Sequence, residues 1–106
     1  MNALSPVPGH SSGNPLARDT AEELARTLRA VADPTRLQLL SVILGSDGER
    51  ATIGQLADAL GVSQPTVTHH VRILDEDGLL VREREGKFIW LSIAPHRRAA
   101  VEDLLR

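Results

Sequence analysis

At 106 residues the chain fits one domain with a modest core, and its charged fraction of 25% is ordinary for a soluble globular protein. The absence of cysteine excludes disulfides, thiolate metal sites, thiol redox switches and cysteine nucleophiles. A net charge of −2 argues against an indiscriminate polyanion binder. It leaves room for a sequence reader, because phosphate contacts depend on where the cations lie.

No apolar run approaches the ~20 residues of a membrane span, and the N-terminus lacks the basic and apolar blocks of a secretory signal. We therefore expect no membrane partner and a cytoplasmic, nucleoid-associated protein. Residues 1–19 contain five proline and glycine residues among Ser and Asn. This composition predicts a disordered N-terminal arm, followed by a single domain over residues 20–106.

The domain is expected to begin with two helices. Thr20 is predicted to cap the first, whose apolar stripe is Leu24, Leu28 and Val31. The dipeptide Asp33-Pro34 ends that helix and begins the next, with Asp33 as the cap. The second helix, to about residue 44, has apolar residues on nearly every side, which indicates a central buried helix.

Two further helices follow at close spacing. Thr52 and Gln55 form the pattern of a capping box for a short third helix that ends at Gly61. Ser63 is the predicted cap of a fourth helix, which Gly78 closes. Two helices joined by residues 61–63 have the spacing of a helix-turn-helix.

A hairpin and a last helix complete the pattern. β-Branched and aromatic residues on both sides of Glu85-Gly86 predict two strands within residues 79–93. Pro95 can begin a terminal helix, which at about ten residues must pack on something to be stable. The predicted fold is therefore mainly α with a small β-hairpin: a winged helix-turn-helix of about five helices and a two-stranded wing.

The fourth helix divides into an inward and an outward face. Val67, His70, Val71 and Leu74 fall at i, i+3, i+4 and i+7 and form the inward stripe. The first two turns of the outward face carry no acid, only hydrogen-bonding groups, which suit a DNA major groove. An ordinary solvated face is the alternative interpretation. The candidate DNA-contacting residues on this helix are Gln64, Thr66, Thr68, His69 and Arg72.

Adjacent histidines suggest a metal site, but neighbours on a helix point about 100° apart and cannot chelate one ion together. We assign His69 to the DNA-facing side and His70 to the edge of the core. Arg82, Arg84 and Lys87 in the wing are candidate phosphate contacts. Two interleaved glutamates reduce the net charge of the wing to +1. The same charges could instead protect a strand edge from pairing with another chain.

These elements together resemble the ArsR/SmtB family of transcriptional repressors from about residue 20 to residue 106. The matching segments are residues 32–37, which read ADPTRL, 56–60, which read LADAL, 63–74, which read SQPTVTHHVRIL, and 78–81, which read GLLV. Gly86-Lys87 with the following strand completes the set. Each segment is weak evidence alone, and their order and spacing make the resemblance specific.

The resemblance implies a homodimer joined through the first and last helices, here residues 20–32 and 95–106. The two recognition helices would enter successive major grooves of an imperfect palindrome in a double-stranded DNA operator, with half-sites about 10 base pairs apart. Short apolar helices at the chain ends also favour a dimer, because a domain this small offers them few partners.

The sequence departs from the family at its metal sites. Thr52, Ile53 and Gly54 stand where many members carry Cys-x-Cys, and none is a soft ligand. The second family site would rest on His96, which lies beside two arginines and is a poor site for a dication. We expect no metal and no cofactor, and the inducer is not identified by the sequence.

The sequence also bears on two other classes of function. A winged-helix module that binds a protein through the same face, and never DNA, is favoured by the nearly neutral wing. An enzyme is not expected, because no nucleophile with a base, no glycine-rich phosphate loop and no metal cluster is visible.

Overall fold

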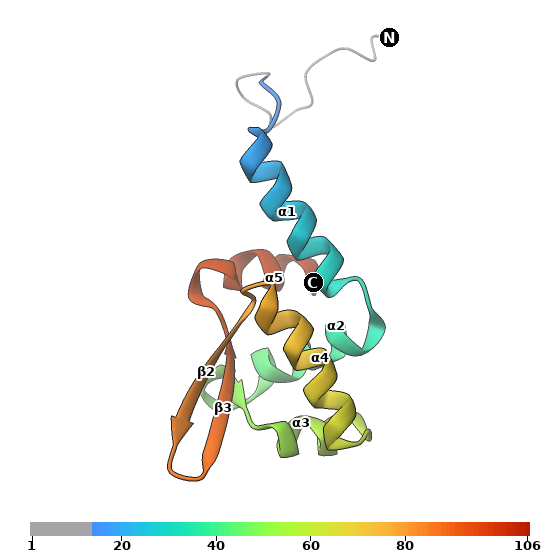
Figure 1. Cartoon of the computed structure of the whole chain (residues 1–106), viewed down its shortest axis with the longest axis vertical. Coiled ribbons are helices and arrows are strands. Elements are labelled where there is room, and N and C mark those ends of the chain that lie inside the picture. Colours follow the sequence, from blue (N-terminus) through green and yellow to red (C-terminus); the bar gives the residue numbers. More distant parts are fainter. Residues whose placement is uncertain (1–13) are drawn as a thin grey trace.

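The computed structural model describes residues 14–106, so most of the predicted arm lies outside the described residues. In chain order the elements are α1 (Arg18–Val31), α2 (Pro34–Gly45), the 3-10 turn η1 (Asp47–Glu49), β1 (Arg50–Ala51), α3 (Ile53–Leu60), α4 (Gln64–Glu76), β2 (Leu80–Glu85), β3 (Phe88–Ile93), the 3-10 turn η2 (Pro95–Arg97) and α5 (Arg98–Leu104). Figure 1 shows that α1 projects from the body of the domain and that the β2–β3 hairpin extends from the same body as a wing. The predicted winged helix-turn-helix is confirmed.

An aliphatic core joins α2, α3, α4 and the sheet. Its centre is α2, where Leu39, Leu40 and Ile43 are fully buried. Asp33 caps this helix by accepting the backbone N–H of Arg36 at 3.0 Å, as predicted. The other large and fully buried side chains are Leu56, Val67, Val71, Leu74, Leu79, Leu91 and Val101.

The sheet has one more strand than predicted. β1, only two residues long, pairs antiparallel with β3, so the strand order is β1-β3-β2. A two-residue strand carries no period that sequence reasoning can detect. The register of Glu85 opposite Phe88 places the hairpin turn at Gly86 and Lys87, one residue later than Glu85-Gly86. Gly86 has a φ of 62°, which glycine adopts without steric cost.

The prediction for the start of α1 is wrong. The helix begins at Arg18, and Thr20 lies inside it; Ala17 holds the N-cap position without a side-chain hydrogen bond. The buried side of α1 carries Thr27, Ala30 and Val31, while Leu24 is 44% and Leu28 is 43% exposed. The large apolar side chains therefore point away from this subunit's core.

The chain end also differs in detail from the prediction. Pro95 begins the 3-10 turn η2, and α5 follows from Arg98. In α5, Val101 is buried and Leu104 is 43% exposed. In residues 14–106 no helix is both long and apolar enough to cross a membrane.

Candidate nucleic-acid interface

The helix-turn-helix is held by caps that the sequence predicts. Thr52 accepts the backbone N–H of Gln55 at 3.1 Å, and the Gln55 side chain accepts the backbone N–H of Thr52 at 3.0 Å. Gly61 ends α3 with a φ of 70°, and its N–H donates to the carbonyl of Ala57. Ser63 then caps α4 by accepting the N–H of Thr66 at 3.2 Å. These local hydrogen bonds fix the residue at which α4 begins and the direction of α4 relative to α3.

The outward face of α4 is presented as the sequence predicts. Val67, Val71 and Leu74 are buried, which turns the opposite side of the helix to solvent. The predicted DNA-contacting residues on α4 are all exposed. Four of them line an open hollow together with Pro65: Gln64, Thr68, His69 and Arg72. One concave surface therefore combines amide, hydroxyl, imidazole and guanidinium groups.

Thr66 lies apart from this group. It does not line the hollow, and its hydroxyl is 2.9 Å from the hydroxyl of Ser63. The Ser63–Thr66 contact belongs to the N-cap of α4. Of the five predicted residues on this helix, Thr66 is therefore the one whose side chain is hydrogen-bonded within residues 14–106.

The two histidines lie in different environments. His69 is exposed, whereas the side chain of His70 is only 14% exposed. The Nδ1 atom of His70 lies 3.3 Å from the Arg36 guanidinium and 3.8 Å from the Asp33 carboxylate, so it faces the beginning of α2. Because a guanidinium only donates, Nδ1 acts as the acceptor in that contact. In residues 14–106 no group of three potential ligands could hold a metal ion.

Asp33 links α2 to α4. Its pKa is lowered from the usual value, first by the backbone N–H of Arg36 and then by the nearby Arg36 and His70 side chains. A carboxylate that is kept ionised here is a stronger acceptor for the helix N-terminus. The junction therefore fixes the inner side of α4 at the level of His70.

The predicted wing cations are all exposed, but they differ in the contacts they already make within the protein. Arg82 Nε lies 3.2 Å from the Asp75 carboxylate near the end of α4. Arg84 donates to the carbonyl of Gly86 at 3.4 Å, within the wing itself. Lys87 stands at the turn, with its Nζ 5.5 Å from the centre of the Phe88 ring. The two cations nearest the tip are thus the better placed for an external partner.

Sequence reasoning missed Arg50. It lies in β1, and its guanidinium contacts the Glu85 carboxylate at 3.0 Å and the Trp90 ring centre at 4.1 Å. Nothing in the sequence near residue 50 signals this role, because the contacts depend on β1 pairing with β3 across 35 or more positions. Arg50 adds a cation beside the wing and compensates one of its two glutamates.

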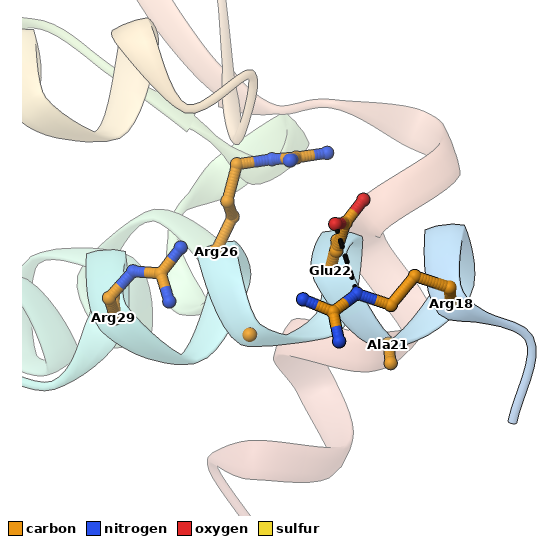
Figure 2. A pocket seen from close by; sticks show the side chains of 6 residues that line it. Arg18, Ala21, Glu22, Arg26 and Arg29 are labelled. Atoms are coloured by element: carbon orange, nitrogen blue, oxygen red, sulfur yellow. Dashed lines mark hydrogen bonds and ion pairs between the residues drawn. The ribbon is translucent and has the colours of Figure 1, made fainter.

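The second exposed surface lies along α1. Leu24 and Leu28 are joined by Leu104 of α5 among the large apolar side chains that this subunit leaves exposed. Figure 2 shows a neighbouring groove on α1, where arginine side chains project beside Ala21 and Glu22. Arg18 pairs with Glu22 at 3.1 Å across the groove. The exposed leucines on α1 and on α5 leave apolar area that residues 14–106 do not cover.

Comparison with known proteins places this architecture in a family. A family model described as a helix-turn-helix domain matches residues 31–83. The transcriptional repressor SdpR of Bacillus subtilis is 34% identical over 65 residues, which are 61% of this chain and 69% of SdpR. A probable mercury resistance operon repressor of Streptomyces lividans is 42% identical over 82 residues, or 77% of this chain and 63% of that protein.

The chain belongs to the ArsR/SmtB family. It is thus a member of a family of helix-turn-helix transcriptional regulators and not an enzyme. Among solved structures, HlyU of Vibrio cholerae has a TM-score of 0.74 at 25% identity, covering 83% of this chain and 94% of HlyU. A second solved structure is the homodimeric winged helix-turn-helix DNA-binding domain of a possible ArsR-family regulator from Mycobacterium bovis. It has a TM-score of 0.69 at 26% identity, covering 87% of this chain and 84% of that domain.

The matched segments do not extend over the whole of the sequence relatives. In NmtR and in SmtB, both from Mycobacterium tuberculosis, the matched segments span 63% and 62% of the protein. What those relatives do as whole proteins is therefore carried to this chain only as a proposal.

Proposed function

We propose that this ArsR/SmtB-family protein is a homodimeric, sequence-specific DNA-binding repressor that recognises an imperfect palindrome through α4 and the wing. The observation that carries the proposal is the outward face of α4. There Gln64, Thr68, His69 and Arg72 line one exposed hollow. Amide and imidazole groups can bond base edges in the major groove, and the guanidinium is placed for phosphate.

The wing supplies the second contact of the proposed interface. Arg84 and Lys87 lie at its tip, and Arg50 compensates Glu85. Phosphate contacts from Arg72, Arg84 and Lys87 in each subunit would give up to about six per dimer. Arg82 and Thr66 belong to the proposed set but contribute less, because Asp75 and Ser63 already engage their polar groups.

The exposed apolar surface of α1 and α5 supports the dimer. Leu24, Leu28 and Leu104 each expose over two fifths of their surface in the single subunit. Burying them against a second copy would remove this apolar area from water. A structural relative from Mycobacterium bovis is homodimeric, which supports a homodimer here. Such a regulator would act in the cytoplasm, at the nucleoid.

The inducer of the proposed repressor is not a thiolate-bound metal, because the chain has no cysteine. Thr52, Ile53 and Gly54 occupy the start of α3, where family metal sensors carry such ligands. Thr52 instead serves as the N-cap of α3. These three residues therefore supply no soft ligand for an inducing metal.

A second candidate function is a winged-helix module that binds a protein and not DNA. It is favoured by the ion pairs that tie Arg82 to Asp75 and Arg50 to Glu85, which reduce the free cations near the proposed interface. A protein partner would be read by the same exposed face of α4.

DNA binding and protein binding are separated by a gel shift with the promoter of the protein's own gene and with a random-sequence pool, followed by a salt titration. A repressor should select one sequence. A plot of the logarithm of its affinity against the logarithm of the salt concentration should have a negative slope of up to about −5. A wild-type protein that forms no shifted band with either DNA at about 50 mM salt would exclude the repressor and favour the interaction module.

A further inference from the structure

Arg97 is a buried cation that the interface described above does not use. Only 8% of the residue is exposed, although the adjacent His96 and Arg98 are more open to solvent. Its guanidinium Nη1 donates to the hydroxyl of Thr27 in α1, and its Nη2 donates at 3.2 Å to the carbonyl of Asp77, which caps α4. One side chain at the end of η2 thus connects α1 to the end of α4.

Ion pairs add to this three-way contact, but two of its buried polar atoms make no hydrogen bond. The Arg97 guanidinium lies 3.5 Å from the Glu23 carboxylate and 3.9 Å from that of Asp77. Yet the buried Nε of Arg97 and Oδ2 of Asp77 have no hydrogen-bond partner. The Arg97 and Asp77 side chains are both mostly buried, and desolvation offsets much of the attraction in such a pair, so its net contribution to folding is small. What the contact does supply is a fixed geometry between three elements.

Apart from Arg97, α1 is held at its C-terminal end, where Ala30 and Val31 are buried and Arg36 Nε donates to the carbonyl of Ala30. Beside the Arg97 contact α1 and α4 border an open hollow lined by Arg26, Arg29, Ala30, Ile73, Glu76 and Asp77. Figure 1 shows that only the C-terminal part of α1 lies near the body, while the rest projects away from it. Arg97 contacts α1 at Thr27 and Glu23, which precede this packed end, so without Arg97 α1 could pivot about its C-terminal end and change its angle to α4.

We propose that Arg97 is a positioning residue that sets the angle between the dimerisation helices and the recognition helix, and thereby the spacing of the half-sites that the dimer accepts. The inference rests on the proposed function. In a symmetric dimer, the position of each α4 relative to α1 and α5 fixes the distance between the two recognition helices. One base pair changes the required separation by ~3.4 Å and the rotation by ~34°, so a small change of angle alters the accepted spacing.

The test uses the full chain and an operator that the wild-type protein selects from a random pool. Affinity is measured for this operator and for versions with one base pair inserted or deleted between the half-sites. The first variant, Arg97→Met with Asp77→Asn, removes the buried charges at similar volume, so the fold should be retained. The second, Thr27→Val, removes the hydroxyl that accepts from Arg97 and keeps the shape of the side chain.

Wild-type protein should lose about tenfold or more in affinity when the spacing changes, as expected for a misplaced half-site. Both variants should remain dimeric by sedimentation and lose about threefold or less. Arg98→Met is the matched control, because Arg98 bonds Glu49 at 2.7 Å and makes no ion pair or hydrogen bond to α4 among residues 14–106. It should keep the wild-type discrimination between spacings.

A stabilising role alone would lower the melting temperature and weaken binding equally at every spacing. Folded, dimeric variants that retain the wild-type spacing preference, or that weaken uniformly, would therefore overturn the inference while leaving the proposed function intact. If the double variant does not fold, Thr27→Val alone decides by the same criterion. A wild-type protein that selects no operator overturns the proposed function and this inference together.

Discussion

Arg50 Nη1 lies 3.0 Å from Oε2 of Glu85, so an ion pair joins the two-residue strand β1 to the end of β2 in the wing. The same guanidinium lies 4.1 Å from the centre of the Trp90 ring. Counting Arg50 with the wing raises the net charge of this region from +1 to +2. Glu85 is therefore the residue through which the charge of the proposed DNA-facing wing is best adjusted.

Replacing Glu85 with Gln should tighten DNA binding. The change removes an anion and releases Arg50, so the affinity should rise by roughly threefold to tenfold at low salt and by less at high salt, where exposed charges are screened. Fluorescence anisotropy with labelled DNA over a salt series measures the effect. Asp19→Asn removes one exposed acid from the far end of α1 and should leave the affinity at its wild-type value. An equal gain in both variants would mean that only net charge matters.

Replacing Gln64 or His69 with Ala should weaken binding to the selected operator by ~1–3 kcal/mol for each lost base contact. Arg72→Ala should weaken binding to all DNA sequences alike, because a phosphate contact carries no sequence information. Competition gel shifts with operator and random DNA distinguish the two effects. Unchanged operator affinity in Gln64→Ala and His69→Ala would remove these residues from the interface.

Replacing both Leu24 and Leu28 with Glu should convert the proposed dimer to a folded monomer. Both side chains are more than two fifths exposed in the single subunit, so a charge there does not enter its core. It would instead be buried against the second copy, which is costly for an unpaired carboxylate. Sedimentation gives the oligomeric state, and circular dichroism reports folding. Val81→Glu, an exposed apolar position on the wing, is the control for oligomeric state and should leave the dimer in place. A variant that stays dimeric would place the interface elsewhere.

Replacing Asp33 with Ala should lower the free energy of unfolding by ~1 kcal/mol at neutral pH, because α2 loses its N-cap. The pKa of Asp33 is lowered in the folded state, so its ionised form stabilises the fold above the reference pKa of 3.8. That part of the stability is lost as the pH falls through the lower pKa of the folded protein.

The pH effect is isolated with Asp33→Asn, which still offers a capping oxygen but does not ionise. Urea unfolding of wild type and variant at about pH 6 and about pH 3 should show their difference shrinking in acid. A constant difference across that range would mean that the charge of Asp33 does not contribute.

The sequence alone determined most of the local structure, because the signals for it lie within a few residues of each other. The Thr52–Gln55 capping box, Asp33 before Pro34, Ser63 and Gly61 each placed a helix end where the structure has it. The inward stripe of α4 was also predicted, because Val67, Val71 and Leu74 repeat at helical spacing. From that stripe follow the exposed face and the separation of His69 from His70.

The tertiary structure decided what depends on residues far apart in the chain. Leu24 and Leu28 follow the same helical period as a core stripe, and only the packing of α1 through Thr27, Ala30 and Val31 shows that they face outward. Arg50 and Arg97 are single charges without a local pattern. Glu85 lies 35 positions from Arg50, and Thr27 lies 70 positions from Arg97. Only the fold brings these groups together. Periodicity and capping act over one or two helical turns, whereas an ion pair between distant elements exists only once the core has formed.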